Sequence, residues 1–206
     1  MKGAHWLTTR LDLVKSLGVL TLMAGLCLAA VPQRQVPRGA GASLASRLFG
    51  PIASLAASIQ WVRADLAFRQ GRLELFLARA QVALTLAPDA GGGWRYLAWH
   101  QAFHLASIER ESDPTRRLAW VRAALATAAE GERVAADPGD LAMLSGEIVL
   151  KCALGDPELP WPGGSAELWE QAAAHFERAM GLGYDAALAG ALANSARAQA
   201  KLERDQ

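Results

Sequence analysis

The segment WRYLAWHQAFHLA, residues 94–106, carries the pattern that decides the fold. When residues are placed about 100° apart, as in an α-helix, its apolar side chains separate onto two opposite faces. One face carries Trp94, Leu97, Ala98, Leu105 and, just beyond the segment, Ile108, and the other carries Tyr96, Trp99, Phe103 and Ala106. An isolated amphipathic helix needs one apolar stripe, whereas a helix inside a stack contacts a neighbour on each side. The segment therefore predicts a helix in the middle of a helical array.

The chain from Leu44 onward favours helix throughout, because no stretch alternates apolar and polar residues for long and Ala, Leu, Arg, Glu and Gln dominate. Glycines and prolines divide it into about seven pieces, with the triple glycine Gly91–Gly93 expected to precede the third helix. We predict helices over residues 52–70, 72–87, 94–110, 114–136, 141–154, 165–181 and 185–204, with Asp113, Asp140 and Ser165 as N-caps. The turns are mostly short, so neighbouring helices should be antiparallel and the fold class all-α.

Three helix ends recur along the chain: LTLAPDA, VAADPGD and GLGYDAA, about 50 and 46 residues apart, each after an Ala-rich amphipathic helix. Such a period is typical of repeat architectures. The pattern resembles the tetratricopeptide (TPR) family of helix-turn-helix repeats over roughly residues 52–204. In the best match, AAAHFERAMGLGY, the residues Ala172, Phe176 and Ala179 occupy the family's small, large, small positions. The resemblance implies a TPR-like solenoid, although Phe76 and Gln101 depart from the family's usual alanine and tyrosine.

The resemblance also implies a concave groove lined by the first helix of each repeat, which would hold a protein or peptide partner. Seven positions of this sequence match the family's groove positions: Trp61, Asp65, Phe68, Arg69, Arg95, Trp99 and Phe103. Aromatic residues flanked by charges are typical of peptide-binding surfaces. The alternative is that Trp99 and Phe103 are ordinary core residues in a closed helical bundle.

An apolar run, Ser16–Val31, lies near the start of the chain behind basic residues. We predict that residues 11–31 form an uncleaved single-pass membrane anchor, and that the helical domain lies outside the cytoplasm. A cleaved signal segment and a buried soluble helix are the alternatives. Residues 32–47, with two prolines and several small residues, are expected to be a linker. The predicted organisation is therefore an anchor over 1–31, a linker over 32–47 and a TPR-like helical domain over 48–206.

The sequence holds no phosphate-binding loop, no GxSxG nucleophile elbow and no HExxH pattern, and its basic residues are interleaved with acidic ones in the body. We therefore expect no enzyme, no nucleic-acid partner and no cofactor. The two cysteines, Cys27 and Cys152, do not indicate a disulfide framework. The sequence predicts a membrane-anchored interaction module that acts as scaffold or assembly factor for a membrane-associated complex.

One alternative function uses His100 and His104. These residues lie one helical turn apart, a spacing at which two imidazoles can bind one metal. The alternative is a metal- or haem-associated accessory protein, although further ligands are scarce nearby. We expect structural histidines and no metal site.

Overall fold

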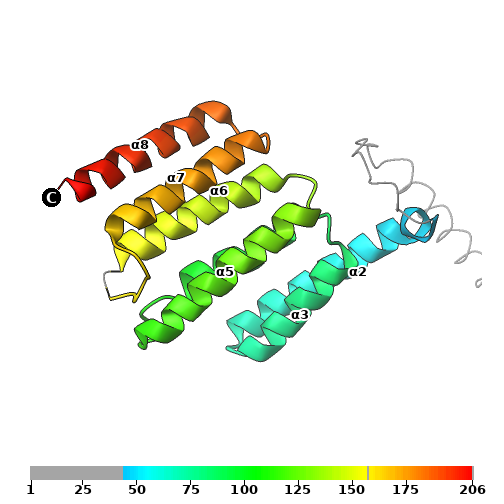
Figure 1. Cartoon of the computed structure of the whole chain (residues 1–206). Helices are drawn as coiled ribbons and strands as arrows, with labels where there is room; N and C mark the ends of the chain where they lie inside the picture. Colours follow the sequence, from blue (N-terminus) through cyan, green and yellow to red (C-terminus); the bar gives the residue numbers. More distant parts are fainter. Residues whose placement is uncertain (1–43, 157, 206) are drawn as a thin grey trace, which may run out of the picture. The chain divides into compact units, whose positions relative to one another are not determined.

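The computed structural model describes residues 44–156 and 158–205, and within them it holds seven α-helices and no strand (Figure 1). The prediction of an all-α fold is therefore confirmed for this part of the chain. The helices are α2 (Leu44–Arg69), α3 (Leu73–Leu86), α4 (Gly91–His100), α5 (Pro114–Val134), α6 (Pro138–Ile148), α7 (Ser165–Gly181) and α8 (Ala186–Arg204). The chain divides into two units between Leu55 and Ala56, and the body described below is the unit from Ala56 onward.

Helices that are consecutive in the chain lie side by side, from α3 through to α8. In addition, α4 contacts α6, which is the helix two places further on. This stepwise packing is solenoid-like, and it explains why residues 94–106 need two apolar faces. The two packed faces differ from the predicted ones, however. Trp94, Leu97 and Tyr96 pack with α2, α3 and α6, whereas Ala98, Ala102 and Ala106 pack with α5 and the end of α6. Trp99 and Ile108, which are predicted on the apolar faces, are exposed.

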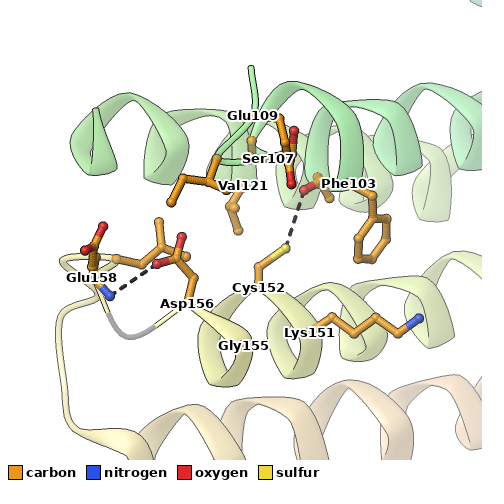
Figure 2. Close-up of a pocket in the computed structure, with 13 residues that line it drawn as sticks. Phe103, Ser107, Glu109, Val121, Lys151, Cys152, Gly155, Asp156 and Glu158 are labelled. Atoms are coloured by element: carbon orange, nitrogen blue, oxygen red, sulfur yellow. Dashed lines mark hydrogen bonds between the residues drawn. The ribbon is translucent and has the colours of Figure 1, made fainter. Parts of the chain in front are cut away.

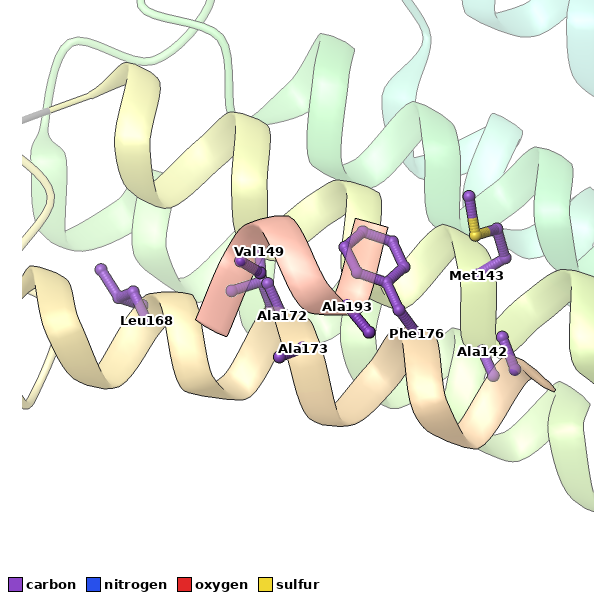
Figure 3. Packing of buried hydrophobic residues seen from close by; sticks show 10 residues of the cluster. Ala142, Met143, Val149, Leu168, Ala172, Ala173, Phe176 and Ala193 are labelled. Carbon is purple, nitrogen blue, oxygen red and sulfur yellow. The ribbon is translucent and has the colours of Figure 1, made fainter. Parts of the chain in front are cut away.

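The C-terminal part of the core is built from small side chains around one large ring (Figure 3). Phe176 is fully buried, and so are Ala172 and Ala179 on the same helix. Gly146 of α6 lies directly under the ring, where any Cβ atom would collide with Cε1 of Phe176. The small, large, small pattern is therefore used for close packing of α7 against its neighbours.

Of the three predicted N-caps, only Asp113 is confirmed, and Asp185, which was not predicted as a cap, also caps a helix. Asp113 accepts a hydrogen bond from the Thr115 N–H, and Asp185 accepts from Ala187 and Leu188. The other two N-cap predictions are wrong. Ser165 lies inside the first turn of α7 and donates to Glu203, while Asp140 lies inside the first turn of α6, which begins at Pro138.

The boundaries of the helix that contains the opening segment also differ from the prediction. It begins at Gly91, so the triple glycine forms its first turn and does not precede it. Gly93 lies where α4 approaches α2 and α3, because a Cβ there would lie 3.0 Å from Cζ2 of Trp61 and 3.2 Å from Leu84. The close packing of Gly93 against these two helices favours the helical turn despite the low helix propensity of glycine. The helix ends at Leu105 in a π-helical turn, Gln101–Leu105, and not at Arg110.

The N-terminal predictions fall mostly outside the described residues. The predicted anchor, residues 11–31, lies there, as does most of the predicted linker, residues 32–47. The last four linker residues are already helical, because α2 begins at Leu44 and continues through Pro51. Across residues 44–156 and 158–205, none of the helices combines the length and apolar character needed to cross a membrane.

Candidate functional site: an aromatic surface on α2 and α4

Three of the predicted groove residues line one hollow of about 490 Å³. Trp61, Asp65 and Arg69 come from α2, and Tyr96 faces them from α4. The rings of Trp61 and Tyr96 meet edge to face, with centroids 5.3 Å apart. The remaining lining is Val62, Gly92 and Gly93, so most of the exposed lining is apolar. The hollow exists because the glycines leave open the space that larger side chains on α4 would fill.

The polar groups of this hollow are bound to one another. The hydroxyl of Tyr96 donates to Oδ1 of Asp65 at 3.2 Å, and Nε of Arg69 donates to Oδ2 of Asp65 at 2.8 Å. Burial, followed by the charge of Asp65, raises the pKa of Tyr96 to about 12. The phenol therefore stays protonated at physiological pH and holds the ring in place as a hydrogen-bond donor.

Phe68 does not line this hollow. Its side chain packs in a cluster of aromatic rings. Its ring centroid lies 5.2 Å from that of Phe76 and 4.9 Å from that of His100. The guanidinium of Arg110 lies 5.1 Å from the centroid of the Phe68 ring. Phe68 therefore has mainly a packing role, and only part of its side chain is accessible to solvent.

Trp99 is the most open of the predicted aromatic residues, with 40% of its surface exposed. Its ring lies 5.7 Å from that of Phe103 and 4.9 Å from that of His104. The interpretation of Trp99 as an ordinary core residue is therefore wrong for this side chain. Phe103 is half-buried, and the ammonium of Lys151 lies 5.5 Å from its ring.

Arg95 lies one turn before Trp99 on the same helix. Its Nη1 atom lies 2.9 Å from Oδ1 of Asp140 at the start of α6. Both side chains are partly exposed, so the pair is expected to contribute little to stability. The sequence assigned Asp140 to a helix cap, whereas the structure uses its carboxylate as the partner of Arg95.

A second hollow, of about 450 Å³, lies between two π-helical turns (Figure 2). Phe103 contributes from the turn Gln101–Leu105, and Lys151 and Cys152 contribute from the turn Val149–Ala153. π-helical turns often lie at functional sites because they shift the register of side chains. Sequence reasoning missed this hollow, since neither turn has a recognisable sequence signal.

One wall of the second hollow is fixed by a buried arginine. Arg117 is fully buried and binds Asp156 through Nε at 2.8 Å and Glu158 through Nη2 at 3.3 Å. It also donates to the backbone carbonyl of Ser112 at 3.0 Å. Removing one member of such a network would leave a buried charge unpaired. Arg117 therefore anchors the loop after α6 onto the start of α5.

Cys152 lies in the same hollow, with its Sγ atom 3.5 Å from the carbonyl oxygen of Ala102 (Figure 2). Burial, reinforced by the negative charge of Asp156, raises the pKa of the thiol to about 11. A thiol of that pKa is protonated at neutral pH and is a weak nucleophile. The geometry of this hollow therefore does not activate Cys152.

His100 and His104 lie close together, with ring centroids 5.1 Å apart. Nδ1 of His100 is 3.0 Å from the carbonyl oxygen of Tyr96, and burial lowers the pKa of His100. In the part of the chain that the structure describes, no group of three or more His, Cys, Asp or Glu side chains is arranged to hold a metal ion. The two histidines instead pack among the aromatic rings of Phe68 and Trp99.

The seven predicted groove residues therefore do not form a single pocket. Trp61, Asp65 and Arg69 share the first hollow with Tyr96, and Phe103 belongs to the second. Phe68 has mainly a packing role, while Trp99 and Arg95 lie along the exposed side of α4. Tyr96 and the glycines were missing from the prediction, although Tyr96 lies on the same helical face as Trp99. Comparisons of the chain with protein-family models, with curated proteins and with solved structures find no match.

Proposed function

We propose that this protein is a membrane-anchored, TPR-like interaction module that holds a segment of a partner protein against α2 and α4. It would act as a scaffold or assembly factor of a membrane-associated complex. The observation that carries the proposal is a group of accessible aromatic residues on α2 and α4. Trp61 and Tyr96, both half-buried, wall a hollow of about 490 Å³, and Trp99, 40% exposed, lies one turn beyond Tyr96 on α4. Exposed aromatic residues beside a hollow are the residue types that carry most of the energy in protein interfaces.

The charged groups around this surface suit a binding role. Asp65 is bound by Arg69, and Arg95 is bound by Asp140, so each charge lies in a preformed pair. A partner that covers the surface would therefore not leave a buried charge without a partner of opposite sign. The rings of Trp61 and Tyr96 are held by their mutual contact, and such preorganisation lowers the entropy lost on binding.

The apolar run at Ser16–Val31 supports the membrane part of the proposal. Its basic flanks and length suit an anchor that keeps the module beside a membrane complex. Anchoring raises the effective concentration of the module near its partner, so a moderate intrinsic affinity is sufficient. The proposal places the helical domain on the extracytoplasmic side.

The test uses affinity capture with the full-length chain from solubilised membranes, with partners identified and quantified by mass spectrometry. Trp99→Ala and Arg95→Ala are compared with Met180→Ala, since Met180 on α7 is also 40% exposed. Truncation of a binding aromatic should weaken capture by about 2 kcal/mol, or roughly 30-fold. We expect this for Trp99→Ala and a smaller loss for Arg95→Ala, with melting temperatures near that of the wild type.

The proposal fails if Trp99→Ala and Met180→Ala capture the same proteins in the same amounts as the wild type. It also fails if Trp99→Ala loses its partners only because it unfolds while Arg95→Ala captures normally. In the second case Trp99 would have a structural role, and a closed helical core would be the better description.

A further inference from the structure

The second hollow, about 450 Å³ in volume, has the size and the mixed lining of a small-molecule site. Its apolar lining comes from the first π-helical turn and the residues after it, from α5, and from the loop after α6: Ala102, Phe103, Ala106, Ile108, Val121 and Leu159. None of its lining residues also lines the first hollow. The two hollows can therefore bind different molecules independently of each other.

The charged groups around the second hollow are unequal in number. Three carboxylates line it, from Glu109, Asp156 and Glu158, against one ammonium group, from Lys151. Arg117 neutralises only part of this excess, because its one guanidinium is shared by Asp156 and Glu158. Within the part of the chain that the structure describes, Glu109 has no ion-pair partner. The hollow therefore keeps a net negative charge, which favours a cationic ligand.

The negative charge of Asp156 is held in a fixed position. The fully buried guanidinium of Arg117 donates to both carboxylate oxygens of Asp156, at 2.8 and 3.2 Å. Figure 2 shows Asp156 and Glu158 on one side of Cys152 and Lys151 on the other. A ligand therefore meets a preorganised charge distribution, which lowers the free energy that binding costs.

The thiol of Cys152 reports the sign of the electrostatic potential inside the hollow. Burial raises its pKa to about 11, the charge of Asp156 raises it further, and the opposing effect of Lys151 is smaller. A negative charge is therefore disfavoured beside Cys152, whereas a positive charge in the hollow is attracted by Asp156.

We propose that the second hollow binds a small organic amine in its protonated form. The ammonium group is bound by Glu109 in the field of Asp156, and the apolar body of the ligand packs on Phe103 and Ile108. Glu109 is exposed, so the charged end stays at the mouth of the hollow, where its other N–H groups can donate to water. The charge-assisted hydrogen bond orients the ligand, and burial of its apolar body supplies affinity.

The test uses Cys152 as the reporter in the full-length chain. Cys27 and Cys152 are the two cysteines of the sequence, so Cys27→Ser leaves a single thiol, which dithiodipyridine modifies without reacting with amines. The amine probes are hexylamine, phenethylamine and tryptamine. Phenethyl alcohol and hydrocinnamate are the neutral and anionic counterparts of phenethylamine.

We expect at least one of the amines to protect the thiol. At a concentration about ten times its Kd, a bound amine should slow the modification of Cys152 about tenfold, because the reagent reaches only the unoccupied hollow. Phenethyl alcohol and hydrocinnamate should each bind at least about tenfold more weakly than phenethylamine, since neither carries a positive charge.

Two substitutions of opposite charge test the electrostatic part of the proposal. Glu109→Gln should weaken amine binding about fivefold or more, because it removes the carboxylate that accepts from the ammonium group. Lys151→Gln should strengthen amine binding about twofold or more, because it removes a positive charge from the lining. Glu74→Gln is the matched control, since Glu74 is an exposed glutamate on α3 that lines neither hollow. All three side chains are exposed, so the melting temperatures should stay near that of the wild type.

Several outcomes overturn the proposal. If none of the three amines slows the modification of Cys152, the hollow is not an amine site. Equal protection by phenethylamine and phenethyl alcohol would show an apolar pocket without preference for a cation, and stronger protection by hydrocinnamate would show a site for anions. The proposal also fails if Glu109→Gln binds the amine as well as Glu74→Gln does, or if Lys151→Gln binds it more weakly than the wild type.

Discussion

The region from α2 to α4 and the region from α6 to α8 use the same helical hairpins but fill the space between helices differently. The first region places Trp61, Phe76 and Tyr96 between its helices. The second region packs mainly alanines around Phe176 (Figure 3). Alanine contacts let helices approach closely along their length, whereas rings set against glycines leave irregular gaps. The hollow between α2 and α4 and the exposed ring of Trp99 belong to the aromatic region.

The two regions separate stability from recognition within one architecture. In the alanine-rich region the buried ring of Phe176 is surrounded on every side, so any change of its volume should lower the free energy of unfolding. In the aromatic region Phe76 is fully buried, but Trp61, Tyr96 and Trp99 are partly exposed, so their apolar surface is available for a partner. Three predictions test this division, from the largest expected effect to the smallest.

Phe176→Ala should destabilise the protein by about 3–5 kcal/mol, because it leaves a cavity between α6 and α7. The ring is fully buried and lies over Gly146, where the backbone cannot move closer without rearranging the helix pair. Urea unfolding measures the change in the free energy of unfolding. Met180→Ala, on the exposed side of the same helix, is the control and should change it by about 0.5 kcal/mol or less. Equal losses for both variants would show that the alanine-rich region is not tightly packed.

Acidification should destabilise both regions through one histidine in each. Burial lowers the pKa of His100 and of His175 below their ordinary value of 6.5. The unfolded chain therefore binds protons at these sites more readily than the folded chain does. The stabilising effect is complete above the unfolded pKa and is lost as the pH falls from there through the lower folded pKa. The change should be smaller than the loss of Phe176, since it involves only the ionisation of partly buried rings.

Replacing the two histidines one at a time separates the contributions of the two regions to acid destabilisation. His100→Gln and His175→Gln should each remove part of the fall in melting temperature between about pH 7 and 5. The measurement is thermal unfolding over this pH range. A fall that remains unchanged in both variants would show that other groups control the acid stability.

Gly92→Ala should move stability and binding in opposite directions. The added methyl group meets no atom within 4 Å, and Gly92 lines the first hollow. Alanine in place of glycine in a helical turn should stabilise the fold by about 0.5–1 kcal/mol. Partner capture should fall, because the hollow becomes smaller.

Gly93→Ala is the matched comparison for this last prediction. Its methyl group would lie 3.0 Å from Trp61 and 3.2 Å from Leu84. Because of this crowding, Gly93→Ala should lower the stability, whereas Gly92→Ala should raise it. The measurements are melting temperature and partner capture. If Gly92→Ala captures its partner as well as the wild type, the first hollow is not part of the binding surface.

The candidate site was predictable only in part. The helical wheel brings Trp99 and Phe103 to one face, and the spacing of Trp61, Asp65 and Arg69 brings them to another. These relations are local, and the structure keeps them. Which rings meet across helices was not predictable, because it depends on how closely two helices approach.

The sequence by itself determined the helices, most of their ends and the need of residues 94–106 for neighbours on both sides. These features follow from the 3.6-residue period and from capping chemistry, which act within one turn of the chain. Only the tertiary structure decided that Gly91–Gly93 would be helical, that Asp140 would bind Arg95, and that Tyr96 would complete the hollow. Each of these depends on residues far along the chain whose volumes set the distance between helices, and that distance is a property of the packed core.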